Sequence, residues 1–310
     1  MSKQKWDAEN IPDQIGTVGI VTGSGSGIGY EAARVAANKR AEVIIAVRSL
    51  EKGNAAAARI REQNSDANVA VMKLDLADLA SVAAFADEFK GKYSRLDRLI
   101  NNAGVMIPPY SKTADGFELQ FGTNHLGHFA LTGELLDMLD ATPGSRIVNV
   151  SSGAHKAGNI NFDDLNWEKR KYSAWRAYGD SKIANLYFTF ELSRRLQAAG
   201  SSILVTAAHP GYTATELQRT MPLAGLVNAL FAQDKSMGAL PTLRAAYDTD
   251  SKSGDYYGPK GFMEMGGFPV IVQPNKLSQD ANIARKLWDV SEQLTGVKFE
   301  FDKKARAAAD

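Results

Sequence analysis

The sequence predicts an α/β fold, a single domain in which a doubly wound parallel sheet carries helices on both faces. Two observations support this prediction. Short runs rich in Val and Ile alternate with longer segments of helical apolar spacing, and a glycine-rich turn joins the first run to the first of these segments. Such alternation is typical of βαβ units, whose right-handed crossovers cover both faces of a parallel sheet. No linker, repeat or change of composition divides the chain, so we expect one domain over residues 1–310.

The predicted strands and helices alternate through the first two thirds of the chain. Six strands are expected at 17–22, 42–47, 68–73, 96–100, 146–151 and 202–208. Helices are expected between them, at 28–38, 50–63, 79–90, 118–140 and 173–199. In a doubly wound sheet the ligand crevice lies beyond the carboxyl ends of the strands.

The stretch 212–267 differs from the rest because it lacks the βα rhythm. We expect it to lie over the ligand crevice as a substrate lid. Its apolar piece 221–231 places four large side chains at helical spacing on one face: Leu223, Leu226, Leu230 and Phe231. A contact with another subunit or with a membrane surface is the alternative interpretation of that face.

Composition and charge narrow the function classes. The 36 basic residues nearly balance the 35 acidic ones, for a net charge of +1, so no global basic field favours nucleic acid as a partner. The chain has no cysteine, which excludes disulfides, thiolate nucleophiles and Cys-ligated metals. Without an apolar leader or a run of about 18 uncharged apolar residues, we expect a cytoplasmic protein with no membrane span. Assembly into a homo-oligomer is left open.

A glycine-rich segment, TGSGSGIG at 22–29, follows the first predicted strand and opens the first predicted helix. A helix N-terminus presents free N–H groups and the positive end of a dipole, and a pyrophosphate binds there if no side chain blocks its approach. We therefore predict a dinucleotide-binding turn of the Rossmann type, whereas a glycine-rich turn without a ligand is the alternative. The predicted cofactor-binding residues of this turn are Gly23, Ser24, Ser26, Gly27, Ile28 and Gly29.

The end of the second predicted strand bears on the choice of cofactor. Dinucleotide folds place an acid near this point to hold the adenosine ribose 2′-OH. Here that position is Val47, and Arg48 follows it, which suits a 2′-phosphate because a guanidinium pairs well with phosphate oxygens. The sequence thus predicts a preference for NADP(H), with NAD(H) as a weaker alternative cofactor. A solvated surface arginine is the other interpretation.

Three further clusters fall where this fold places its chemistry. Asn102 follows the fourth strand, Ser152 follows the fifth, and Tyr178 and Lys182 share one face of the next helix because they are four residues apart. Hydride transfer needs a proton delivered to, or taken from, the substrate oxygen. A phenol with a pKa near 10 does this poorly at neutral pH unless a cation stabilises the phenolate, and Lys182 supplies that charge. Ser152 supplies a hydrogen bond to the substrate oxygen.

These motifs, in this order, resemble the short-chain dehydrogenase/reductase family over about residues 15–296. The resemblance implies a catalytic set of Ser152, Tyr178 and Lys182, joined by Asn124, which would hold a water in the proton relay. It implies that Lys182 also bonds the nicotinamide ribose. The further cofactor contacts that it implies are Asp75, Leu76, Asn102, Ala103, Gly104, Tyr178, Pro210, Gly211 and Thr213.

Several details are similar to the retinol-dehydrogenase-like branch of that family. They are the segment VNVSSGAH, the position of Arg48, an insert at 159–176 and the segment ARKLW near the carboxyl end. Ser24 departs from the pattern, since this branch commonly has Asn there. We expect that difference to remove one side chain that stabilises the turn.

The leading prediction is therefore an oxidoreductase that transfers a hydride to or from a small, lipophilic carbonyl or alcohol substrate. A non-catalytic dinucleotide-binding sensor or scaffold is the alternative. A nucleotide-sugar epimerase or dehydratase is disfavoured, because those relatives prefer GxxGxxG at the turn and a longer C-terminal region. His125 and His128 are interpreted as structural rather than metal-binding, and Glu216 and Glu264 as solvated acids.

Overall fold

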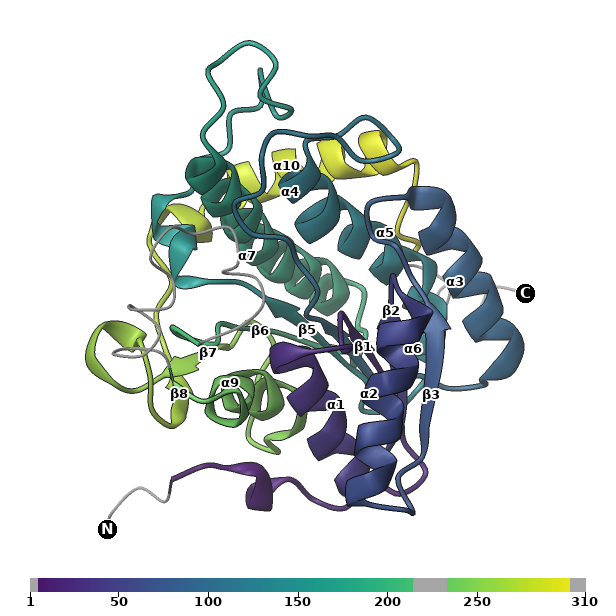
Figure 1. Ribbon diagram of the computed structural model, residues 1–310. Coiled ribbons are helices and arrows are strands. Elements are labelled where there is room, and N and C mark those ends of the chain that lie inside the picture. Colours follow the sequence, from purple (N-terminus) through teal and green to yellow (C-terminus); the bar gives the residue numbers. More distant parts are fainter. Residues whose placement is uncertain (1–4, 214–232, 302–310) are drawn as a thin grey trace.

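The computed structural model describes residues 5–213 and 233–301. One sheet of eight strands forms its centre, in the order β3-β2-β1-β4-β5-β6-β7-β8 (Figure 1). The strands are β1 (Val18–Thr22), β2 (Glu42–Val47), β3 (Val69–Lys73), β4 (Arg98–Asn101), β5 (Arg146–Val150), β6 (Leu204–Ala208), β7 (Tyr256–Pro259) and β8 (Pro269–Ile271). All neighbours pair in parallel except β7 and β8, which are antiparallel.

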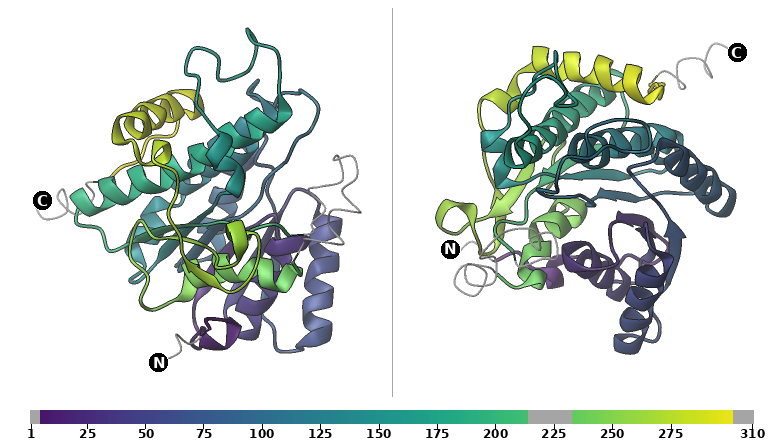
Figure 2. Two further views of the ribbon diagram at one scale, coloured as in Figure 1. Left: turned by 90° about the vertical axis from the view of Figure 1, so that its left-hand side faces the viewer. Right: turned by 45° about the horizontal axis from the view of Figure 1, so that its top comes forward.

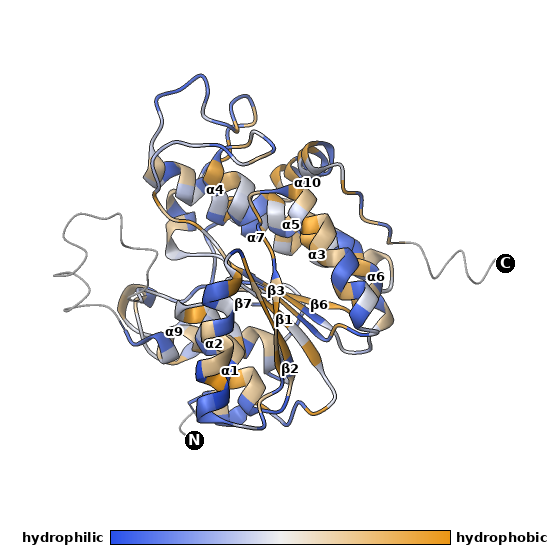
Figure 3. Ribbon diagram, turned by 45° about the vertical axis from the view of Figure 1, so that its right-hand side comes forward, coloured by the Kyte–Doolittle hydropathy of each residue, from blue (hydrophilic) through white to orange (hydrophobic). Residues whose placement is uncertain are grey.

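Helices cover both faces of this sheet, as the sequence predicts. The helices are α1 (Gly27–Asn38), α2 (Leu50–Gln63), α3 (Leu79–Lys92), α4 (Leu119–Phe121), α5 (Gly127–Glu134), α6 (Leu136–Ala141), α7 (Ala174–Ala198), α9 (Lys235–Tyr247) and α10 (Ala281–Thr295). Helices α1, α2 and α9 pack on one face, and α3, α5 and α7 on the other (Figure 2). Apolar strands lie between the two helical layers (Figure 3), so each face of the sheet has its own core.

The six predicted strands and four of the five predicted helices are confirmed, with ends shifted by up to two residues. The prediction of one continuous helix over 118–140 is wrong. That stretch contains α4, a π-helical turn at Gly122–Leu126, then α5 and α6. In the turn the Gly127 N–H bonds the carbonyl oxygen of Gly122, five residues back rather than four. The apolar spacing continues through the turn, so periodicity does not reveal it.

The expectation that 212–267 lacks the βα rhythm is also wrong. Helix α9 and strand β7 continue the doubly wound pattern, with Ala207 and Ala208 of β6 opposite Tyr256 and Tyr257 of β7. Helix α9 gives no amphipathic signal because it is buried nearly all round, and Pro241 lies inside it. The apolar piece 221–231, with its stripe of four large side chains, lies outside the described residues, so its role as a lid stays a prediction.

None of the helices within residues 5–213 and 233–301 combines the length and the apolar character that crossing a membrane requires.

Candidate active site

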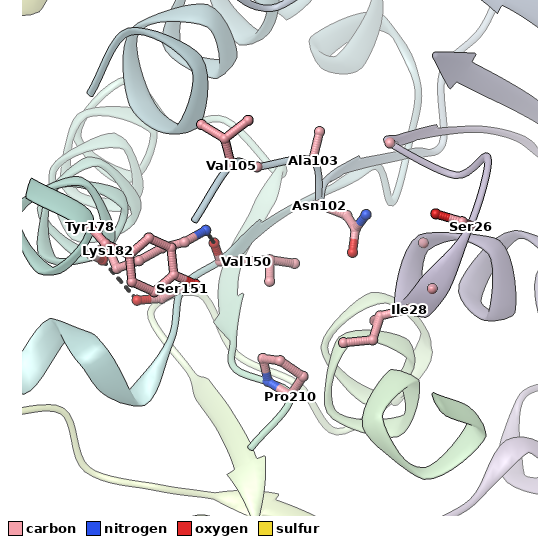
Figure 4. A pocket seen from close by; sticks show the side chains of 14 residues that line it. Ser26, Ile28, Asn102, Ala103, Val105, Val150, Ser151, Tyr178, Lys182 and Pro210 are labelled. Carbon is pink, nitrogen blue, oxygen red and sulfur yellow. Dashed lines mark hydrogen bonds between the residues drawn. The ribbon is translucent and has the colours of Figure 1, made fainter. Parts of the chain in front are cut away.

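A cavity of about 340 Å³ opens at the carboxyl ends of β1, β4 and β5. The chain leaves β1 toward β2 and leaves the neighbouring β4 in the opposite direction, toward β5, and this reversal opens a crevice between β1 and β4. Figure 4 shows Tyr178 and Lys182 on one side of the cavity and Ser26 and Ile28 on the other. Its lining is Gly23, Ser26, Gly27, Ile28, Gly29, Asn102, Ala103, Gly104, Val105, Val150, Ser151, Tyr178, Lys182 and Pro210.

The glycine-rich turn between β1 and α1 packs tightly against the loop after β4. Gly23 has φ +68°, and a Cβ there would come within 2.9 Å of the Ala103 Cα. A Cβ at Gly29 would overlap the side-chain amide of Asn102. The first turn of α1 carries no acidic residue that would repel a phosphate. The turn therefore fits a dinucleotide pyrophosphate at the helix N-terminus.

Ser24 corrects one sequence expectation. Its side chain is buried, and its hydroxyl donates to the Val21 carbonyl oxygen at 2.7 Å. The turn has therefore not lost a stabilising side chain at this position. Because the hydroxyl points back to β1, Ser24 does not line the cavity.

The loop after β4 is fastened to the end of β1 by Thr22. The Thr22 hydroxyl oxygen accepts the backbone N–H groups of Asn102 and Ala103, each at 2.9 Å. In return the Asn102 side-chain amide donates to the Thr22 carbonyl oxygen at 2.8 Å. Three hydrogen bonds therefore join the two loops that wall the cavity.

Tyr178 and Lys182 lie on the face of α7 that borders the cavity, with the Lys182 Nζ 5.7 Å from the centre of the Tyr178 ring. The Nζ donates to the Val150 carbonyl oxygen at 3.2 Å. Burial lowers the pKa of Lys182 to about 8. Burial also raises the pKa of Tyr178 to about 12, and a hydrogen bond with Ser152 opposes that rise only in part. Lys182 is not among the groups that shift the Tyr178 pKa in this structure, so the expected lowering by its charge is not seen and the phenol keeps its proton at neutral pH.

Asn124 lies in the π-helical turn, and its side chain is tied to two neighbours. Its amide oxygen accepts the Val105 N–H at 2.8 Å, and its amide nitrogen donates to the Val105 carbonyl oxygen and to the Ser181 hydroxyl, both at 2.9 Å. Both N–H groups of the amide are therefore committed to protein partners. This side chain joins the loop after β4 to α7 between Tyr178 and Lys182.

The segment after β6 borders the cavity at Pro210 and is held from behind by a loop after β7. The buried His209 accepts the Gly211 N–H at Nδ1, while its Nε2 lies 2.9 Å from the carboxylate of Glu264. Contact with His209 lowers the pKa of Glu264. Glu264 is only 25% exposed and also pairs with Lys156, so its interpretation as a solvated acid is wrong. It anchors the Pro210 segment.

The remaining predicted site residues do not line the cavity. Arg48 is exposed directly after β2, and Asp75 is half-buried after β3, where its carboxylate accepts the Ala77 N–H at 3.0 Å. The Thr213 hydroxyl donates to the Pro210 carbonyl oxygen at 3.0 Å. The other predicted residues outside the lining are Leu76, Ser152 and Gly211. Sequence reasoning missed Val105, Val150 and Ser151, which line the cavity directly beside predicted motifs.

Within the described ranges 5–213 and 233–301, no group of three or more His, Asp or Glu side chains is placed to hold a metal ion.

Comparisons with known proteins agree with this arrangement. The family model described as short chain dehydrogenase matches residues 17–224. Retinol dehydrogenase 12 of Mus musculus is 43% identical over 290 residues, which cover 92% of this chain and 88% of that protein. Retinol dehydrogenase 13 of Homo sapiens is 43% identical over 290 residues, covering 90% of this chain and 84% of that protein.

Solved structures show the same fold. A crystal structure of an uncharacterised protein from Mycobacterium paratuberculosis has 44% sequence identity and a TM-score of 0.82, covering 96% of this chain and all of that one. A short-chain dehydrogenase from Shigella flexneri, solved in complex with NADP, has 25% identity and a TM-score of 0.60. That match covers 79% of this chain and 97% of the other.

Proposed function

This chain belongs to the short-chain dehydrogenase family, in its retinol-dehydrogenase-like branch, and from that premise we propose its reaction, cofactor and catalytic residues. The proposed reaction is hydride transfer between NADP(H) and the carbonyl or alcohol carbon of a small lipophilic substrate. The observation that carries the proposal is one cavity that joins an open glycine turn at a helix N-terminus to the buried pair Tyr178 and Lys182. A non-catalytic sensor would need the turn but not the pair.

The proposed chemistry divides between cofactor and protein. A bound NADPH supplies the hydride to the substrate carbon. Tyr178 gives its phenolic proton to the substrate oxygen, which turns C=O into CH–OH. Ser152 holds that oxygen by a hydrogen bond, and Lys182 stabilises the phenolate that Tyr178 becomes. The raised pKa of Tyr178, about 12, suits this acid role because the proton is present at neutral pH.

The proposed cofactor site uses the first and second βα units. The N–H groups at the start of α1 would bind the pyrophosphate, and Asp75 and Leu76 would lie along the adenosine. Arg48 would pair with the 2′-phosphate. Its guanidinium is exposed and makes no hydrogen bond or ion pair with the residues that the structure describes. The relative from Shigella flexneri, which was solved with NADP, supports the same choice.

Charge reversal at Arg48 tests the cofactor. A charge-assisted contact is worth about 1.5–3 kcal/mol, so we expect NADPH to bind about tenfold or more tightly than NADH. Arg48→Asp should reverse this order, because a carboxylate repels the 2′-phosphate and accepts the ribose hydroxyl of NADH. Titration calorimetry with both cofactors measures the two affinities.

Lys252→Asp is the matched control for Arg48→Asp. Lys252 is exposed in the turn before β7, at the amino edge of the sheet and thus opposite the cavity. The same charge change there should leave both affinities unaltered. Equal affinity of the wild type for NADPH and NADH would remove the role given to Arg48.

The proposed lipophilic substrate is supported by the retinol dehydrogenases among the relatives and by the apolar surface beside Tyr178. Trp175 lies one turn earlier on α7, with its ring centre 6.4 Å from that of Tyr178, and is 49% exposed. We expect long-chain and polyene aldehydes to show at least about tenfold higher kcat/KM than propanal, since each buried CH₂ contributes about 0.8 kcal/mol. NADPH absorbance over a panel of carbonyls measures this. A preference for propanal would remove the apolar pocket from the proposal.

A further inference from the structure

Two buried histidines three residues apart have different surroundings. His125 places its Nε2 2.8 Å from the Ser291 hydroxyl on α10, among the rings of Phe121, Phe129 and Phe188. His128 instead bonds two residues that adjoin the active site. Its Nδ1 lies 3.0 Å from the Asn124 carbonyl oxygen, and its Nε2 lies 2.9 Å from the Thr22 hydroxyl.

These partners fix the tautomer of His128. A carbonyl oxygen can only accept, so Nδ1 must carry the proton that bonds Asn124. The unprotonated Nε2 then accepts the hydroxyl proton of Thr22. Burial is the main cause that lowers the pKa of His128 to about 4; the hydrogen bond with Asn124 opposes it and the Lys182 cation adds to it, so the ring is neutral at ordinary pH.

The Thr22 hydroxyl continues the connection toward the cofactor-binding loops. Its oxygen accepts the N–H groups of Asn102 and Ala103 while its proton is given to His128. The Ile100 carbonyl oxygen is a second acceptor for this proton at 3.4 Å, but the His128 Nε2 is closer at 2.9 Å. A single hydrogen-bonded path runs from the loop after β4 to the carbonyl of Asn124.

The side chain of Asn124 links the π-helical turn to helix α7, which carries Tyr178 and Lys182. Its side chain donates to the Ser181 hydroxyl, directly before Lys182 and three residues after Tyr178. The backbone of Asn124 belongs to a π-helical turn, in which the regular α-helical ladder is interrupted. Within this turn the Asn124 carbonyl oxygen accepts a hydrogen bond from the His128 ring.

We propose that His128 is a positioning residue of the active site, which sets the spacing between the cofactor-binding loops at Thr22 and the catalytic helix through the backbone of Asn124. The role rests on the proposed function. This role requires a donor toward Asn124 and an acceptor toward Thr22 on opposite sides of one rigid, uncharged ring. Neutral imidazole is the side chain that offers both.

The same substitution at both histidines tests the proposal. His125→Phe and His128→Phe each keep a ring and remove its nitrogens. We expect comparable losses of thermal stability, but a fall in kcat/KM of about tenfold or more only for His128→Phe, because only its partners belong to the site. Equal kcat/KM in the two variants, with similar melting temperatures, would overturn the proposal.

Two conservative variants of His128 distinguish a role in positioning the active site from a general contribution to the stability of the fold. The amide N–H of His128→Asn lies near the place of Nδ1 and can still bond Asn124, but it does not reach Thr22. We expect this variant to recover kcat to within about threefold of wild type while NADPH affinity stays reduced. His128→Gln, which reaches Thr22 instead, should show the opposite pattern. The same kcat and the same affinity in both variants would contradict the assignment.

A nitrogen-15 NMR spectrum of the histidine rings gives a readout that is independent of turnover. We expect His128 to show the neutral Nδ1-protonated form at every pH above about 5, since its pKa is about 4. The Nε2-protonated form would overturn the proposal even in an active enzyme. If the wild type reduces no carbonyl, the proposed function fails, whereas this spectrum and the NADPH affinities of the variants still decide the role of His128.

Discussion

Replacing Tyr178 by Phe is expected to lower kcat by about 10²–10⁴-fold, the usual contribution of a positioned general acid. The substitution removes only the hydroxyl, which forms a hydrogen bond with Ser152. The ring stays in its buried place on α7, so NADPH affinity should remain within about twofold of wild type. Steady-state NADPH oxidation and titration calorimetry measure the two quantities on the same preparation.

Tyr187→Phe is the matched control for this change. Tyr187 is also buried on α7, and its hydroxyl has no hydrogen-bond partner among the described residues. Its removal should leave kcat unaltered. A Tyr178→Phe enzyme that keeps more than about a tenth of wild-type kcat would exclude Tyr178 as the proton donor.

Lys182→Met is expected to lower both kcat and NADPH affinity, each by about tenfold or more, because a charged hydrogen bond is lost in a buried site. The Nζ borders the cavity and approaches both the Tyr178 ring and Gly104. The proposed partners of the Nζ are the Tyr178 phenolate and the nicotinamide ribose. Its loss therefore weakens both the proton transfer and the binding of the cofactor. Rapid-mixing kinetics of hydride transfer, with cofactor titration, separates the two losses.

The pH dependence of kcat also tests the role of the Lys182 charge. Burial lowers the pKa of Lys182 to about 8, and a lysine is charged below its pKa. The kcat of carbonyl reduction should therefore fall as the pH rises through about 8, and this limb should be absent in Lys182→Met. A wild-type profile that is flat to pH 10 would contradict the role of the Lys182 charge.

Local patterns in the sequence predict the strands and the residues at their carboxyl ends, because each motif directly follows its strand. The π-helical turn around Asn124 is not predictable in this way, since the apolar spacing runs through it unchanged. Helix α9 is hidden by burial on nearly all sides. The roles of Glu264 and His128 depend on partners far away in the chain: Thr22 lies 106 residues from His128. Only the fold brings such pairs together.

Transfer of deuterium tests the central claim most directly. NADPH that carries deuterium on both C4 positions is incubated with a long-chain aldehyde and the wild-type enzyme, and the alcohol is analysed by mass spectrometry. We expect one deuterium in each alcohol formed, and alcohol formation that falls to background with Tyr178→Phe. Binding of NADPH by the wild type without deuterated alcohol from any aldehyde or ketone of the panel would contradict the account and favour a non-catalytic dinucleotide-binding protein.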